Sequence, residues 1–172
     1  MKSIIVYFSH TGQNWVGGGI VNLVKGNTEV IAEYIRDITG ADLFKIETEK
    51  AYPADYDECT TIAKEEMKKD SRPILKKLPA RDLSEYDVIF VGGPVWWGTY
   101  PMAVFTLLER YDLSNKIIMP FTTHEGSGLG ECVNDVKNLL RGSDVKKGLA
   151  VYGSNVVDAH TDVENWIKEN IK

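Results

Sequence analysis

Short runs of consecutive apolar residues recur along the chain and are the strongest feature of its sequence. The runs are Ile4–Phe8, Val88–Val91, Ile117–Phe121 and Leu149–Tyr152. They are rich in β-branched and aromatic residues, and polar residues do not alternate with apolar ones within them. This is typical of strands buried on both faces of a parallel sheet. Asp42–Glu47 alternates more, so we expect it to form a strand at an edge of the sheet.

Between these runs lie segments whose apolar residues recur with the period of an α-helix. The segments are Thr28–Thr39, Tyr56–Lys69, Met102–Tyr111, Leu129–Leu140 and a final one that contains Val163, Trp166, Ile167 and Ile171. Gly40 and Gly142 follow the first and the fourth segment, as glycine often does after a helix. Thr161 and Glu164 have the spacing of a capping box, which predicts that the final helix starts at this point.

Strands that alternate with helices predict right-handed βαβ units and an α/β fold with an open, doubly wound parallel sheet. Five strands in one domain over residues 1–172 fit the length of the chain. Two segments lie outside the alternation. Gln13–Asn27 contains three consecutive glycines, Gly17–Gly19, and is expected to be a hairpin or a loop. Glu49–Ser84 is a long excursion between the second and third strands, and it carries the second predicted helix.

Composition and charge narrow the classes of function. The net charge of −5 argues against a nucleic-acid binder, because such proteins carry a basic surface. The N-terminus lacks a signal-peptide pattern and no window is apolar enough to cross a bilayer, so we expect a cytoplasmic protein without a membrane partner. Cys59 and Cys132 are expected to be reduced thiols, and the cysteines and histidines do not have the spacing of metal ligands.

The loops after the buried strands are the expected ligand site, because open parallel sheets bind ligands beyond the carboxyl ends of their strands. The first loop, Ser9–Asn14, contains two hydroxyl groups, one glycine and two amides. Backbone N–H groups and side-chain donors of such a loop can bind a phosphate next to a helix N-terminus, here without Lys or Arg. An ordinary polar turn is the alternative interpretation.

The next two loops carry aromatic residues and glycines. Gly92–Pro101 contains two adjacent tryptophans, Trp96 and Trp97, which either stack on a planar ring system or close the core. Thr122–Gly130 has three glycines within five positions, so its backbone either approaches a ligand closely or forms a flexible turn. The three loops together favour a ligand that has both a phosphate and a planar ring.

Motifs in these loops and beside the strands resemble those of flavodoxins, in particular the flavodoxin-like group found in many bacterial genomes. The resemblance covers nearly the whole chain and rests on Tyr7–Gly12, Gly40–Phe44, Tyr86–Ile89, Gly93–Gly98 and Thr123–Gly128. It implies a five-stranded flavodoxin-like sheet in the order 2-1-3-4-5, with helices on both faces. It also implies flavin mononucleotide (FMN) as the cofactor.

The resemblance implies a role for each cofactor-binding residue. The implied phosphate ligands are Ser9, Thr11, Gly12 and Thr28. The residues implied beside the isoalloxazine ring are Pro94, Val95, Trp96, Trp97 and Gly98. Those implied on its far side and along the ribityl chain are Thr123, His124, Glu125, Gly126, Ser127 and Gly128. His10 belongs to the same set as a member of the first loop.

An insertion in the first loop departs from the flavodoxin pattern. It follows Gly12, and the pattern resumes at Asn27. The remaining phosphate ligands are therefore undecided among Gln13, Asn14, Asn27 and Thr28. The insertion can be a flap over the cofactor, a surface hairpin or a dimer contact.

These features predict an FMN-binding electron-transfer protein of the oxidoreductase type, which docks with redox partner proteins. Thr123–Gly130 contains no aromatic residue, so one flavin face is either open or covered by Trp15, Trp96 or the partner subunit of a homodimer. An open face favours the alternative of an NAD(P)H-dependent FMN or quinone reductase that acts on small acceptors. A flavodoxin fold without flavin, with a structural or interaction role, is a third interpretation.

Overall fold

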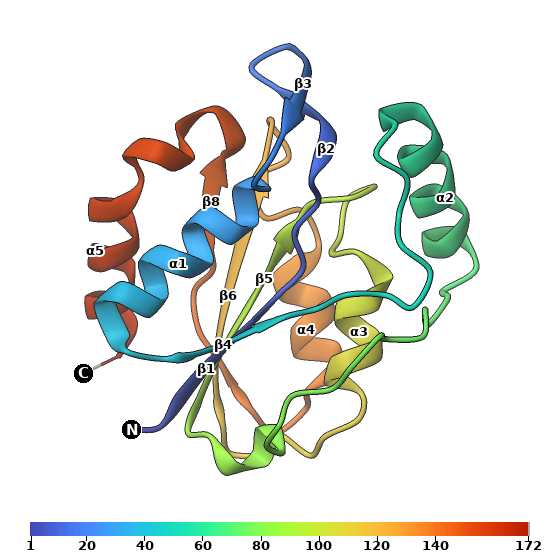
Figure 1. Cartoon of the computed structure of the whole chain (residues 1–172). Coiled ribbons are helices and arrows are strands. Elements are labelled where there is room, and N and C mark those ends of the chain that lie inside the picture. Colours follow the sequence, from blue (N-terminus) through green and yellow to red (C-terminus); the bar gives the residue numbers. More distant parts are fainter. Residues whose placement is uncertain (172) are drawn as a thin grey trace.

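A twisted parallel β-sheet with helices on both faces forms the centre of the protein (Figure 1). The computed structural model describes residues 1–171. The strands across the sheet are, in order, β4 (Asp42–Lys45), β1 (Ser3–Tyr7), β5 (Val88–Pro94), β6 (Ile117–His124) and β7 (Asp144–Val145), and β8 (Leu149–Tyr152) also pairs with β6. In the numbering of the expected strands this is the order 2-1-3-4-5. The prediction of a doubly wound α/β fold is confirmed.

Two short strands share the fifth position, next to β6. β7 pairs with Ile117 and Ile118 at the start of β6, and β8 pairs with Phe121–His124 at its end. The strand predicted at Leu149–Tyr152 is therefore present as β8, whereas β7 was not predicted, because two residues carry no detectable periodicity. The predicted edge strand at Asp42–Glu47 is β4, which pairs with β1 and forms the other edge of the sheet.

The helices lie close to where the sequence predicts them. They are α1 (Asn27–Thr39), α2 (Tyr56–Lys68), α3 (Met102–Leu108), α4 (Cys132–Leu139) and α5 (His160–Asn170), with the short 3-10 helices η1 (Leu83–Glu85) and η2 (Gly153–Asp158). Helix α4 begins at Cys132 rather than at Leu129, because Gly130 has a φ angle of 48°, which a right-handed helix does not allow. Over residues 1–171, no helix is long and apolar enough to span a membrane.

The capping box predicted at Thr161 and Glu164 is wrong. Helix α5 begins at His160, so Thr161 lies inside its first turn, and Ala159 takes the capping position without a side-chain hydrogen bond. The chain enters α5 directly from η2, and the backbone N–H of Val163 donates to the carbonyl of Ala159 at 3.0 Å. The position of η2 therefore determines where α5 starts, and the spacing of Thr161 and Glu164 does not determine it.

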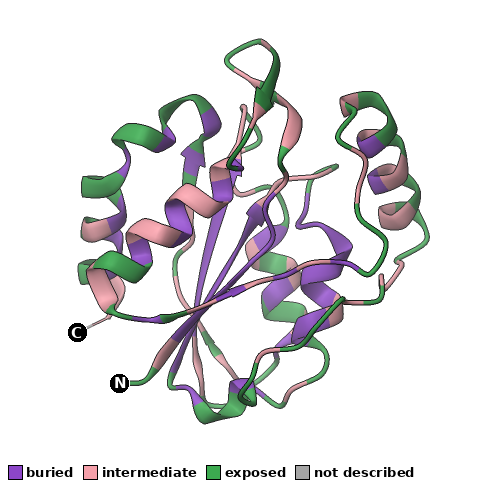
Figure 2. Ribbon diagram, in the orientation of Figure 1, coloured by how far each residue is buried: buried purple, intermediate pink, exposed green. Residues whose placement is uncertain are grey.

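Alternate residues of the central strands face opposite sides of the sheet and fill two hydrophobic cores. In β1, Ile4 and Val6 pack on the side of α3 and α4, whereas Ile5 and Tyr7 pack on the side of α1 and α5. All four side chains are buried, and Figure 2 shows the central strands buried between helices whose outer faces are exposed. Burial on both faces explains why the strand sequences lack polar alternation.

The insertion and helix α2 of the long excursion flank the carboxyl ends of the strands, whereas the later part of the excursion runs to the opposite end of the sheet (Figure 1). The insertion forms an antiparallel hairpin of β2 (Gly12–Val16) and β3 (Gly19–Leu23). Gly17 and Gly18 turn it, and their φ angles of 60° and 89° suit the tight turn of a two-residue hairpin. The long excursion carries α2, which contacts α3 and β2. The hairpin and α2 therefore stand beside the edge of the sheet where a ligand is expected.

We expect Gly92→Ala to lower the free energy of unfolding by about 1–3 kcal/mol, because a larger residue overfills a closely packed core. A Cβ at Gly92 would lie 2.0 Å from Cζ of Phe121, whose ring is fully buried. Urea unfolding followed by circular dichroism measures the change. Gly19→Ala is the matched control, because no atom lies within 4 Å of its added Cβ. Equal unfolding midpoints for the two variants would contradict the expectation.

Candidate functional site

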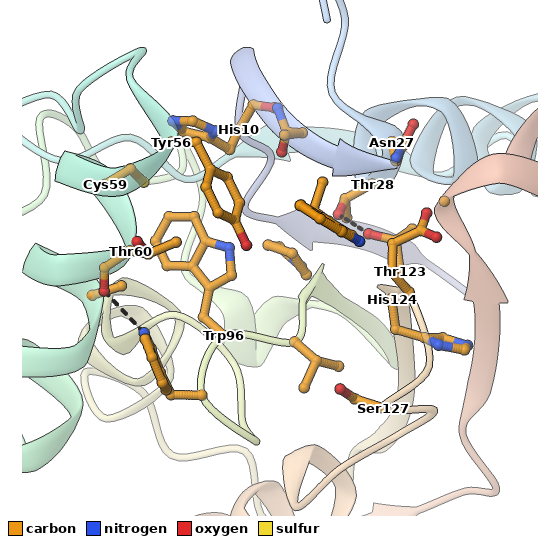
Figure 3. Close-up of a pocket in the computed structure, with 18 of the residues that line it drawn as sticks. His10, Asn27, Thr28, Tyr56, Cys59, Thr60, Trp96, Thr123, His124 and Ser127 are labelled. Carbon is orange, nitrogen blue, oxygen red and sulfur yellow. Dashed lines mark hydrogen bonds between the residues drawn. The ribbon is translucent and has the colours of Figure 1, made fainter. Parts of the chain in front are cut away.

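A cavity of about 330 Å³ opens at the carboxyl ends of β1, β5 and β6 (Figure 3). Its walls come from the loops after these strands, the hairpin, the start of α1, one side of α2 and the start of η2. The strand order reverses between β1 and β5, and in doubly wound sheets a crevice at that position is the usual ligand site.

Most residues that the sequence predicts for the site line this cavity. They are His10, Gln13, Asn14, Asn27, Thr28, Pro94, Val95, Trp96, Trp97, Thr123, His124, Glu125 and Ser127. The predicted residues outside the lining are Ser9, Thr11, Gly12, Gly98, Gly126 and Gly128. The three loops predicted from the sequence therefore converge at the cavity, although some of their residues do not line it.

Ser9 is turned toward helix α1 instead of the cavity. Its Oγ accepts a hydrogen bond from the backbone N–H of Glu29 at 3.2 Å, in the first turn of α1. Gly26 lies directly against it, because a Cβ at Gly26 would come within 2.1 Å of this Oγ. Ser9 therefore satisfies one of the free N–H groups of a helix start. Gly26, at the end of the insertion, packs against the Ser9 side chain and holds it in this position.

The start of α1 brings uncharged hydrogen-bonding groups to the cavity. Thr28 and Thr123 are buried, and their hydroxyl oxygens lie 2.8 Å apart (Figure 3). Asn27 is the first residue of α1, where free N–H groups and the helix dipole favour an anion. Within the described chain, neither Lys nor Arg lines the cavity. Dipoles and hydroxyl groups would therefore hold an anion at this end.

The two adjacent tryptophans occupy different environments. Trp96 packs edge-on against Phe8 and Tyr52, with ring centroids 5.1 Å away in both cases, so it belongs partly to the core. Trp97 is 47% exposed and has a φ of 53°, a conformation that is rare for a bulky residue. This conformation makes a tight turn, in which the backbone N–H of Trp96 donates to the carbonyl of Thr99 at 2.7 Å.

Contacts with α2 and α4 hold the Trp97 turn in place. The Nε1 of Trp97 donates to the carbonyl of Thr60 at 2.9 Å, and Nζ of Lys64 lies 4.7 Å from the ring centroid. The carbonyl of Gly98 accepts from the backbone N–H of Glu131 at 2.7 Å, so it faces the start of α4. Neighbouring groups thus maintain an unfavourable backbone conformation, which is common at functional sites.

One wall of the cavity was missed by sequence reasoning. Its residues are Tyr56, Cys59, Thr60 and Ala63 of α2. Gly153 of η2, which lies beside Asn27 and Glu125, was missed as well. Figure 3 shows the side chains of Tyr56 and Trp96 among those that line the cavity. Trp15, considered only as a possible cover, also lines the cavity, and its ring centroid is 6.1 Å from that of Tyr56. No local pattern marks this wall, because α2 is far from the other loops in sequence.

Three hydrogen bonds attach the segment before α2 to the first loop. The Nε2 of His10 donates to the carbonyl of Pro53 at 2.9 Å. The backbone N–H of Gln13 donates to the carbonyl of Ala54 at 2.8 Å. The backbone N–H of Tyr56 donates in turn to Oε1 of Gln13 at 2.9 Å. The first loop and the start of α2 therefore form one continuous wall.

Two titratable groups of the lining are held in their neutral forms. Burial raises the pKa of the Cys59 thiol to about 12, so it is not a thiolate nucleophile at neutral pH. Burial also lowers the pKa of His124. The Nδ1 of His124 accepts a hydrogen bond from the backbone N–H of Gly126 at 2.9 Å, which requires an unprotonated nitrogen. The cavity is thus suited to binding, with no activated nucleophile at either group.

Comparisons with known proteins agree with this fold. A family model described as Flavodoxin matches residues 21–170, and no curated protein matches the chain. A protein from Bacteroides eggerthii DSM 20697, described provisionally as a flavoprotein, is 24% identical with a TM-score of 0.79, over 99% of this chain and 98% of its own. A flavoprotein from Lactobacillus acidophilus NCFM, solved in complex with FMN, is 25% identical with a TM-score of 0.64, over 93% of this chain and 98% of its own. Oxidised flavodoxin 1 from Bacillus cereus is 17% identical with a TM-score of 0.53, over 98% of both chains.

We expect an NMR titration to give His124 a pKa below its ordinary value of about 6.5. Because the folded state disfavours the protonated ring, the unfolded chain binds the proton more readily in this range. The free energy of unfolding should therefore fall as the pH drops from about 7 to about 5.

His124→Asn is the matched variant for this titration, because asparagine keeps a side-chain acceptor and does not ionise. Its unfolding free energy should depend less steeply on pH over the same range. A pKa of His124 at or above its ordinary value would contradict the expectation.

Proposed function

This chain belongs to the flavodoxin family, and from that premise we propose that its cavity binds FMN and that the protein carries electrons with it. The observation that supports the proposal is the convergence of aromatic side chains and a polar end with hydroxyl and amide groups in one cavity at the strand-order reversal. FMN has the matching parts, a planar apolar ring system and a phosphate. The similar flavoprotein from Lactobacillus acidophilus NCFM, solved with FMN, supports the same cofactor.

The residues present fit FMN. The volume of about 330 Å³ lies within the usual range for a ligand pocket, roughly 300–1,000 Å³. Aromatic side chains, which stack on planar rings, come from the turn after β5, the hairpin and α2. Hydroxyl and amide groups cluster at the start of α1, where a phosphate is stabilised by N–H donors.

Asn27 and Thr28 are the residues that we assign to the phosphate. The other two undecided residues, Gln13 and Asn14, form hydrogen bonds that stabilise the first loop and its contact with α2. The Nδ2 of Asn14 donates to the carbonyls of His10 and Gly12 at 3.0 and 3.1 Å, and the side chain of Gln13 accepts from the start of α2. These bonds shape the wall, whereas the start of α1 faces the cavity with donors suited to an anion.

Tyr56 and Trp15 are the further aromatic residues that we assign to the ring of FMN, beside Trp96 and Trp97. The loop after β6 contributes no aromatic residue, and the rings of Tyr56 and Trp15 lie together in the lining of the cavity. In this arrangement α2 and the hairpin take the place of a last-loop aromatic residue. The exposure of Trp97 and Trp15, 47% and 46%, leaves the rim of the ring site accessible to an electron donor or acceptor.

FMN supplies the redox chemistry when bound, and the protein supplies orientation, access and electrostatics. The aromatic walls limit the access of water to the ring. The protonated Cys59 thiol lines the cavity without offering a competing nucleophile. A reductase of small acceptors is the second candidate, and the accessible rim is the observation that favours it.

We expect Trp97→Ala to raise the Kd for FMN roughly tenfold or more, because a stacking surface is lost. Quenching of flavin fluorescence on titration with protein measures the Kd. Trp97→Phe keeps an aromatic ring and should change the Kd by less than about fivefold. Ile74→Ala, at an exposed residue outside the cavity, is the control for nonspecific effects. If wild-type protein leaves FMN fluorescence unchanged, the proposed cofactor is wrong.

An anaerobic mixing experiment separates the electron carrier from the reductase. We expect FMN-loaded protein to keep its oxidised visible spectrum when NADH or NADPH is added, and to bleach with a strong chemical reductant such as dithionite. The reason is that no dinucleotide-binding motif accompanies the flavin site in this sequence. Rapid bleaching by NADH or NADPH would reject the carrier in favour of the reductase.

A further inference from the structure

The carboxylate of Glu125 connects three parts of the cavity wall. Glu125 is half-buried in the loop after β6, and it lines the cavity. Its Oε2 accepts from the backbone N–H of Gly17, in the turn of the hairpin, at 3.2 Å. Its Oε1 accepts from the backbone N–H of Ser154, in η2, at 3.1 Å. Two backbone donors from distant segments thus converge on one anionic side chain.

The same carboxylate stands beside the start of α1. A Cβ at Gly153 would lie 2.5 Å from Oε1 of Glu125 and equally 2.5 Å from Nδ2 of Asn27. The two side chains are therefore neighbours, and only glycine fits between them and the backbone of η2. Asn27 is one of the residues that we assign to the phosphate of FMN. Glu125 thus places a negative charge at the phosphate end of the cavity.

No cation in the cavity wall balances this charge. Within the described chain, Glu125 is the one carboxylate in the lining, and the lining contains neither Lys nor Arg. The two histidines there, His10 and His124, are engaged through single nitrogens with a backbone carbonyl and a backbone N–H. A phosphate that arrives near Asn27 therefore meets a like charge, and like charges in a partly desolvated site repel each other more strongly than in water.

We propose that Glu125 determines the specificity of the site between phosphorylated and unphosphorylated flavin, by lowering its affinity for FMN relative to riboflavin. The inference rests on the proposed FMN site. Riboflavin has the same ring and ribityl chain without the phosphate, so the charge of Glu125 acts on FMN alone. The carboxylate also serves the fold, because without it the N–H groups of Gly17 and Ser154 lose their acceptor. The carboxylate that binds the hairpin turn is thus the same group that repels the phosphate.

The test is the ratio of the Kd for riboflavin to the Kd for FMN, measured by quenching of flavin fluorescence. Glu125→Gln removes the charge and keeps a side-chain oxygen at nearly the same place. We expect it to tighten FMN binding about tenfold and to change riboflavin binding less than about twofold, so the ratio rises about tenfold. Glu169→Gln, an equal change of charge at an exposed residue of α5 outside the lining, should leave the ratio unchanged.

The salt dependence of this ratio separates the effect of the charge of Glu125 from the effect of its hydrogen bonds to the hairpin and η2. For wild type, raising NaCl from about 0.02 to about 0.5 M should increase the ratio, because salt screens the repulsion. The increase in the ratio with salt should be smaller in Glu125→Gln than in Glu169→Gln. Glu125→Asp keeps the charge on a shorter side chain, so it should weaken the binding of both flavins without raising the ratio. This variant keeps the proposal testable if Glu125→Gln does not fold.

One outcome would overturn the proposal, and another would concern the cofactor itself. A ratio in Glu125→Gln equal to that of wild type rejects the role in specificity. If both Kd values also rise by the same factor in this variant, Glu125 only braces the hairpin. If wild-type protein binds neither flavin, the proposed FMN site fails, which is distinct from an unchanged ratio because a ratio requires measurable binding.

Discussion

The parallel pairing of β5 with β1 on one side and β6 on the other is the constraint on which the cavity depends. Its register sets Tyr7 beside Gly92 and Pro94 beside Thr123, so the three strands end at one edge and their loops converge. Gly92 permits this pairing over the buried ring of Phe121, because no side chain would fit there. Changes in this pairing would displace all three loops together, including the Trp96–Trp97 turn and the start of α1.

The cavity walls combine this rigid edge with two added segments, the hairpin and α2. Hydrogen bonds between the first loop and the segment before α2 join them into one wall, and Glu125 fastens the hairpin turn on the other side. The described lining of the cavity has hydroxyl, amide and helix-dipole donors, one carboxylate and neither Lys nor Arg. Affinity for an anion must then come from oriented dipoles, which act at short range and depend on geometry.

Several residues take roles that their local sequence does not indicate. Trp96 and Trp97 look alike in sequence, yet one packs against Phe8 and Tyr52 while the other forms a strained turn held by α2. Ser9 resembles a phosphate ligand, but the return of the insertion at Gly26 turns it toward α1. Tyr56 carried no signal at all, because an aromatic residue at the start of a surface helix is common. In each case contacts with residues far away in sequence decide the role.

The sequence by itself determined the α/β class, the central strands, most helices and the three loops that meet at the cavity. It could do so because burial on both faces removes polar alternation from strands, and because glycines and paired tryptophans mark unusual loops locally. Only the tertiary structure decided that α2 closes the site, that α5 starts before Thr161, and that Glu125 stands beside Asn27. These features depend on contacts between segments distant in sequence, and no local periodicity or spacing encodes which segments will meet.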